Sequence, residues 1–260
     1  YCFPDSKEGG DPYAVRHLIP VSAGGGLLVA GRATGEVDAI DAAGKRSWSF
    51  RLGAPLLSLT VGRLEGGAET AFAGGEHGRV ALIDAATGQA RGPGTLPGMV
   101  MVARAAVGEG QPVIAAAGSA EPSIRGHSGF VAVVDGTGRR LSMTPLDGQV
   151  MDLAAADFDG DGTDELVAVT GAYRLILMRP SGAALLEEAI ASPSGTKLAV
   201  VRDPSDPRLV VGDGPNLQVR HLRHTDGPRW YAARPLGAMV SGVLLLTLAA
   251  LATLRPPPPQ

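Results

Sequence analysis

The chain has 260 residues, of which 45% are hydrophobic and 19% are charged, so it can bury a sizeable core and is not a disordered polyelectrolyte. A single cysteine, Cys2, excludes an internal disulfide, a cysteine-based zinc site and a Cys-x-x-Cys redox motif. The net charge of −3 argues against nucleic acid as the main partner, because binding phosphates requires a clustered basic surface.

After an N-terminal extension of residues 1–13, one pattern repeats five times over residues 14–232. Each unit contains four short, mostly apolar segments, with a glycine-containing break before the third and a tight turn before the fourth. The turns contain glycines at intervals of 44, 50, 44 and 45 residues, namely Gly44, Gly88, Gly138, Gly182 and Gly227. The longer interval contains an insertion, residues 119–128.

Four strands in each of five units predict an all-β fold, a β-propeller of about five four-stranded blades. The predicted blades are residues 14–51, 56–99, 100–146, 148–191 and 196–232. A solenoid of stacked repeats is the competing architecture. Five units either close into a ring by themselves or belong to a larger ring with further blades upstream.

The insertion at residues 119–128, which includes Arg125 and His127, is a candidate contact loop. Loops added to a rigid scaffold often carry binding residues, and neutral decoration is the alternative interpretation.

Residues 235–254 carry no charge and have the length of a transmembrane helix, about 30 Å. Trp230 and Tyr231 precede this segment, where aromatic rings favour the headgroup layer, and a Pro-rich tail at 255–260 follows it. Two overlapping pairs of small residues would let another helix approach closely: Gly237 with Ser241, and Ala238 with Gly242. The sequence therefore predicts a single-pass membrane protein that contacts other subunits.

An acidic loop lies in the fourth unit, within ADFDGDGTDELVAV at 156–169. Asp157, Asp159 and Asp161 alternate along the chain, and glycines between and after them allow a tight turn. Carboxylates crowded onto one point repel one another unless a cation neutralises them. The sequence favours a hard divalent ion with oxygen ligands, and a solvated acidic turn without metal is the alternative.

Residues 156–169 resemble the calcium loop of FG-GAP and VCBS repeats, which occur in integrin-α-like propellers. The segments AIDAAGKRSW (39–48) and ALIDAATGQ (81–89) resemble the repeats of quinoprotein-type (PQQ-like) propellers. The first resemblance implies one structural Ca²⁺, with a shell formed by the side chains of Asp157, Asp159 and Asp161, the carbonyl of Thr163, and Glu165. The family commonly has Asp where this chain has Glu165, and Asp164 is expected to point outward.

Weaker candidates have simpler explanations. His221 and His224 have a His-x-x-His spacing, but on a strand they point to opposite faces, so a zinc pair is disfavoured. Trp48 is expected to pack between blades. The repeated turn residues Asp41, Asp84 and Asp135 are expected to cap their own turns rather than form an active site.

The sequence thus predicts a non-enzymatic, membrane-anchored, calcium-binding β-propeller that serves as a protein-interaction or accessory subunit of a membrane complex. An extracytoplasmic location, periplasmic or extracellular, is expected because millimolar Ca²⁺ fills weak loop sites there. Arginines before residue 235 favour the opposite orientation on a positive-inside count, which is weak beside a long folded domain. A degenerate quinoprotein-like enzyme and an adhesin or glycan-binding module are the alternatives.

Overall fold

The computed structural model describes residues 14–124, 126–190, 196–201, 207–213, 216–224 and 230–233. The predicted extension, transmembrane segment with its small-residue pairs, and Pro-rich tail lie outside these ranges. Within them the helical segments are short 3₁₀ turns such as Ala23–Gly25, and none has the length and hydropathy of a membrane-spanning helix.

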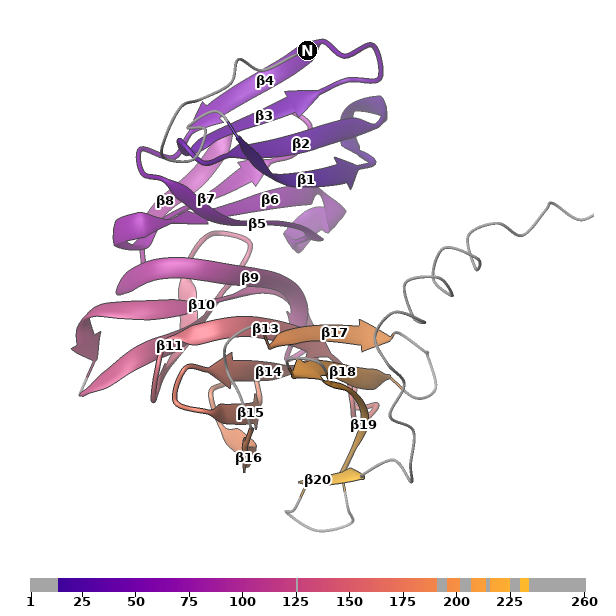
Figure 1. The fold of residues 1–260 in the computed structure, drawn as a ribbon. Coiled ribbons are helices and arrows are strands. Elements are labelled where there is room, and N and C mark those ends of the chain that lie inside the picture. Colours follow the sequence, from indigo (N-terminus) through magenta and orange to yellow (C-terminus); the bar gives the residue numbers. More distant parts are fainter. Residues whose placement is uncertain are drawn as a thin grey trace, which may run out of the picture.

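The described strands form five antiparallel sheets of four strands, one from each sequence repeat (Figure 1). In every sheet the strands are hydrogen-bonded in chain order, which confirms the predicted four-segment unit. Sheet 1 contains β1 Val15–Val21, β2 Leu27–Arg32, β3 Glu36–Ile40 and β4 Arg46–Arg51; sheet 2 contains β5 Leu56–Arg63, β6 Glu69–Gly75, β7 Arg79–Asp84 and β8 Ala90–Thr95; sheet 3 contains β9 Gly98–Gly108, β10 Gln111–Ile124, β11 His127–Val134 and β12 Arg140–Leu146; sheet 4 contains β13 Val150–Ala156, β14 Glu165–Thr170, β15 Arg174–Met178 and β16 Ala184–Ala189; sheet 5 contains β17 Lys197–Val201, β18 Arg208–Asp213, β19 Asn216–His224 and β20 Trp230–Ala233.

The loose alternation of the sequence has a direct structural cause. In sheets 2 to 4 the middle strands lie between two neighbouring sheets, so both of their faces are covered; every residue of β14 is buried. The fourth strand of each sheet lies at its outer edge, and β4 accordingly has alternating exposed and half-buried residues. Burial on both faces therefore replaces the polar and apolar alternation of a one-sided sheet.

Four apolar clusters hold the five sheets together, one at each junction between consecutive sheets. Phe72 of sheet 2 and Phe130 of sheet 3 are fully buried in one of them, and Leu177 of sheet 4 packs with Leu209 of sheet 5 in another. Burying a side chain of this size stabilises the fold by roughly 1.5–3 kcal/mol. Sheet-to-sheet packing is therefore the main source of stability.

The first strands of the sheets pack against one another in chain order, β1 on β5, β5 on β9, β9 on β13 and β13 on β17. Figure 1 shows the described sheets as an open row, with the first and fifth sheets apart at its two ends. Closure by five units alone, one of the two arrangements considered from the sequence, is therefore not what the described residues adopt.

A β-bulge recurs in four of these inner strands. It lies between Val15 and His17, between Leu56 and Ser58, between Val100 and Val102, and between Val150 and Asp152. In β1, β5 and β13 the residue after the bulge is polar and bonds to the next inner strand. The contacts are His17 Nε2 with the Leu57 carbonyl oxygen (3.2 Å), Ser58 Oγ donating to the Val100 carbonyl oxygen (3.1 Å) and the Leu198 N–H donating to Asp152 Oδ2 (3.0 Å).

Asp152 of sheet 4 contacts both neighbouring sheets, through Arg104 of sheet 3 and Leu198 of sheet 5. It is 4% exposed, and its Oδ1 also accepts a hydrogen bond from Arg104 Nη2 at 3.1 Å. We expect Asp152→Ala to lower the free energy of unfolding by about 2–4 kcal/mol, because it leaves the buried Leu198 N–H without an acceptor. Urea denaturation measures this loss. Arg104→Ala removes the half-exposed cation but keeps the hydrogen bond from the Leu198 N–H to Asp152, so it should cost less than Asp152→Ala. Equal losses for the two variants would contradict this role.

Candidate metal centre

The acidic loop, residues 157–164, connects β13 to β14 in sheet 4. Gly160 and Gly162 adopt φ values of +80° and +86°, which a side chain rarely allows, so the loop can turn tightly at both positions. Asp157 fixes this turn from within, since its Oδ1 accepts from the Gly160 N–H at 2.7 Å and its Oδ2 from the Gly162 N–H at 2.9 Å. The loop is therefore folded by its own carboxylates.

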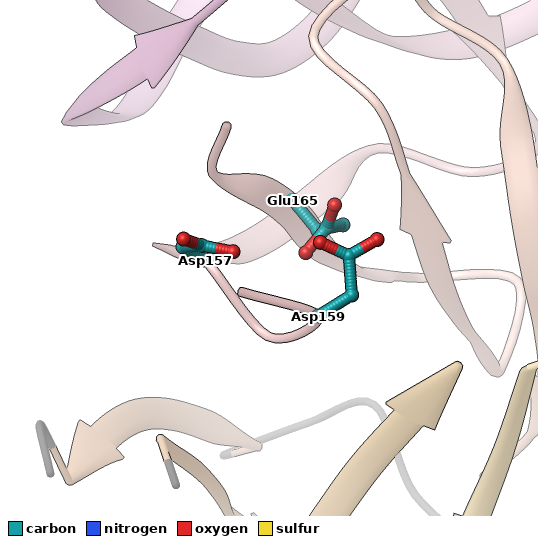
Figure 2. A group of neighbouring side chains, drawn as sticks. All are labelled: Asp157, Asp159 and Glu165. Atoms are coloured by element: carbon teal, nitrogen blue, oxygen red, sulfur yellow. The ribbon is translucent and has the colours of Figure 1, made fainter. Parts of the chain in front are cut away.

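Three of the five predicted ligands converge. One carboxylate oxygen each from Asp157, Asp159 and Glu165 lies within 4.8 Å of the other two. Figure 2 shows the carboxylates of Asp159 and Glu165 side by side, with Asp157 across the loop from them. Asp157 and Asp159 are half-buried, whereas Glu165, the first residue of β14, is fully buried.

Glu165 is the carboxylate of this group that has a buried oxygen without a hydrogen-bond partner. Its Oε2 accepts a hydrogen bond from the Phe158 N–H at 2.9 Å, but its Oε1 is buried without a hydrogen-bond partner. Burial, reinforced by the negative charges of Asp159, Asp161 and Asp157, raises the pKa of Glu165 to about 8. A buried, unpaired carboxylate oxygen facing two further carboxylates is the arrangement that a metal ion would satisfy.

Asp161 and Thr163 are arranged differently from the predicted shell. Asp161 is outside the group of three, its Oδ1 accepts from the Thr163 N–H at 2.8 Å, and its Oδ2 lies 3.9 Å from Arg179 Nη2. Its charge nevertheless acts on Glu165, because it contributes to the raised pKa. Ligation by the Thr163 carbonyl stays a prediction.

The expectation that Asp164 points outward is wrong. Its Oδ2 accepts a hydrogen bond from the Val107 N–H at 2.8 Å, and its own N–H donates to the Val107 carbonyl oxygen at 2.8 Å. Val107 belongs to β9, so this pair of bonds fixes the acidic loop to sheet 3. The partner lies some 57 positions earlier in the chain, and local sequence gives no sign of it.

The donor set fits calcium better than other common metals. The loop and Glu165 offer carboxylate and carbonyl oxygens and contain neither His nor Cys, which excludes the ligands that zinc prefers. Ca²⁺ accepts six to eight oxygens in irregular geometry at 2.3–2.6 Å, whereas Mg²⁺ demands a near-ideal octahedron. Three converging carboxylates on an irregular loop therefore suit Ca²⁺.

The weaker candidates are placed as follows. The carboxylate of Asp41 accepts from the N–H groups of Ala43 and Lys45 in its own turn, and Asp84 and Asp135 do the same in theirs, so turn capping is confirmed. Trp48 packs between sheets as predicted. Its Nε1 donates to the Ala85 carbonyl oxygen at 3.0 Å, and its ring lies over Gly88, where a Cβ would be only 2.7 Å away.

His221 and His224 both belong to β19, and the direction of their side chains stays a prediction. The insertion lengthens the β10–β11 hairpin, in which Ile124 pairs with His127. His127 Nδ1 lies 2.6 Å from Asp147 Oδ1, which ties the hairpin to the connection between sheets 3 and 4. Arg125 lies outside the described residues.

The chain is similar to known proteins in structure but not in sequence. No protein-family model matches it, and no curated protein matches its sequence. Its structure is similar to BBS1N from a complex with ARL6DN, with a TM-score of 0.62 and 15% identity over 83% of this chain and 67% of that one. It is also similar to Sqt1 from Saccharomyces cerevisiae, with a TM-score of 0.59 and 13% identity over 81% of this chain and 66% of that one.

Both neighbours have propeller-like folds, so the described part of the chain is all-β, with five four-stranded sheets in a propeller-like arrangement. The chain spans about two thirds of the length of each neighbour. At these identities the likeness establishes the fold and not an activity.

Proposed function

We propose that the protein is a non-enzymatic, calcium-stabilised propeller-like scaffold, anchored in a membrane by residues 235–254, that serves as an accessory subunit of a membrane complex. The observation that carries the calcium assignment is the fully buried Glu165, whose unpartnered Oε1 accompanies the carboxylates of Asp157 and Asp159. One bound Ca²⁺ would neutralise the cluster and hold the β13–β14 loop against sheet 3. The ion would be structural, because it fixes the loop and the carboxylates are engaged with the loop's own N–H groups.

The scaffold role is supported by the stack of rigid sheets, whose connecting loops offer broad surfaces for another protein. BBS1N, one of the structural neighbours, was solved in complex with a protein partner, ARL6DN. The uncharged stretch 235–254 would confine this surface to a membrane, and its pairs of small residues would allow lateral contact with another helix. The proposed side is extracytoplasmic, where millimolar Ca²⁺ is available.

The anchoring is tested by alkaline carbonate extraction of membranes that contain the full chain. We expect the full chain to remain in the membrane pellet and a variant truncated after residue 233 to be released into the supernatant. Release of both would reject the transmembrane segment. Labelling of Cys2 from outside the membrane by an impermeant thiol reagent would support the extracytoplasmic side, and labelling only after lysis would contradict it.

The accessory-subunit role is tested by extracting the full chain in mild detergent and measuring the mass of the purified complex. We expect a complex with at least one other polypeptide in fixed stoichiometry. Recovery of a lone monomer from its native membrane would contradict the subunit role while leaving the calcium site untouched.

A further inference from the structure

The turn between β15 and β16 differs from its equivalents in sheets 1 to 3. In sheets 1 to 3 the turn before the last strand begins with Asp41, Asp84 and Asp135, and each of these carboxylates accepts hydrogen bonds from N–H groups of its own turn. In sheet 4 the same position is Arg179, which has no acceptor to offer. The turn of sheet 4 therefore lacks the side-chain cap that the described turns of sheets 1 to 3 have.

The backbone shows that these positions are equivalent. The N–H of Arg179 donates to the Ala183 carbonyl oxygen at 2.9 Å and the Gly182 N–H donates back to the Arg179 carbonyl oxygen at 2.8 Å. The turn that begins at Asp135 has the same pair of bonds, with Arg139 and Gly138, both at 3.0 Å. The two turns therefore have the same backbone hydrogen bonds. A difference in backbone shape does not explain why the first residue is Arg179 and not Asp.

The explanation lies in the acidic loop beside the turn. The Arg179 guanidinium is half-exposed and lies 3.9 Å from Asp161 Oδ2, on the loop that also holds Asp157 and Asp159. An Asp at position 179 would instead add a further carboxylate to a cluster that already raises the pKa of Glu165. Arg179 is thus a fixed positive charge at the edge of the candidate metal centre.

We infer that Arg179 is a positioning residue that sets the cation affinity of the loop: it draws Asp161 to itself in the metal-free protein and opposes the arriving cation by its own charge. This inference rests on the proposed calcium site. Its consequence is a site tuned to fill at high rather than trace Ca²⁺ concentrations, as the proposed extracytoplasmic location would require.

The test is calorimetric titration of the detergent-solubilised full chain with CaCl₂. We expect Arg179→Gln to bind Ca²⁺ roughly two- to fivefold more tightly than the wild type, and Arg179→Lys, which keeps the charge, to stay within about twofold of it. The gain should shrink when NaCl is raised from 50 to 500 mM, because salt screens exposed charges. Arg139→Gln is the matched control, since it removes an exposed arginine from the equivalent turn of sheet 3, and it should leave the affinity unchanged.

The outcomes separate this inference from the calcium proposal. If the wild type binds Ca²⁺ but Arg179→Gln binds with equal or lower affinity, the role of Arg179 is wrong and the calcium site stands. If the wild type gives no binding heat at millimolar Ca²⁺ and its melting temperature does not change on chelation, both are wrong. A gain that persists unchanged at 500 mM NaCl would also overturn the inference, because it would come from structure and not from charge.

Discussion

Chelation of calcium should lower the melting temperature of the wild-type chain by about 5–10 °C. A ligand that binds only the folded state at 100 times its dissociation constant stabilises that state by about 2.7 kcal/mol. In a chain of this length each kcal/mol changes the melting temperature by roughly 2–4 °C. The physical source is the attraction between the ion and the carboxylates of Asp157 and Asp159, together with the buried Glu165, whose proton the ion replaces. Differential scanning calorimetry in CaCl₂ and in EDTA measures the change.

Paired variants show whether the effect comes from the loop. The double variant Asp157→Asn with Asp159→Asn should have the same melting temperature in CaCl₂ and in EDTA, because two of the three converging carboxylates are gone. Asp41→Asn, in the capped turn of sheet 1, should retain the full calcium response of the wild type. A wild-type melting temperature indifferent to chelator, or a double variant that still responds, would reject the metal centre.

The metal-free protein should lose stability as the pH rises from 5 to 8. The folded-state pKa of Glu165 is about 8 against an ordinary value of 4.5, so between these values the folded protein holds a proton that the unfolded chain has released. The stabilisation by this proton is therefore full below the ordinary pKa and is lost as the pH rises through the folded pKa. The expected loss is about 3 kcal/mol, measured by urea denaturation in EDTA.

Glu165→Gln isolates this contribution, because glutamine imitates the protonated acid and does not titrate. In EDTA the variant should lose about 3 kcal/mol less than the wild type between pH 5 and pH 8, and it should not respond to Ca²⁺. With saturating Ca²⁺ the wild type should also lose less, since the bound ion stabilises the ionised carboxylate. The same pH profile for wild type and variant in EDTA would show that Glu165 is ionised in the metal-free fold.

The number and composition of the sheets were predictable, because two signals coincide. Turn glycines recur at a nearly constant spacing, and each interval contains four apolar segments, which leaves little choice but a four-stranded unit. The polar groups of the inner strands were not predictable in this way. His17, Ser58 and Asp152 look like interruptions of apolar strands, and only the bulge beside each one shows that it reaches the next sheet.

The metal loop was predictable in composition and less so in its contacts. Alternating aspartates and turn glycines indicated where carboxylates converge, and Asp157, Asp159 and Glu165 do converge. The contacts of Asp164 and Arg179 escaped prediction for a common reason. Asp164 bonds to Val107 in another sheet, and Arg179 reaches the loop from a different turn, so neither contact follows from neighbouring residues. Local sequence also could not predict whether the five sheets close into a ring, because ring closure depends on the rotation between sheets.

The most direct test is a crystal structure of the wild-type protein grown with CaCl₂, examined for anomalous signal at the acidic loop. The proposed function predicts one Ca²⁺ within 2.3–2.6 Å of oxygens from Asp157, Asp159 and Glu165, with Glu165 Oε1 among the ligands. A loop that holds no ion at millimolar Ca²⁺, with Glu165 still buried and unpartnered, would contradict it.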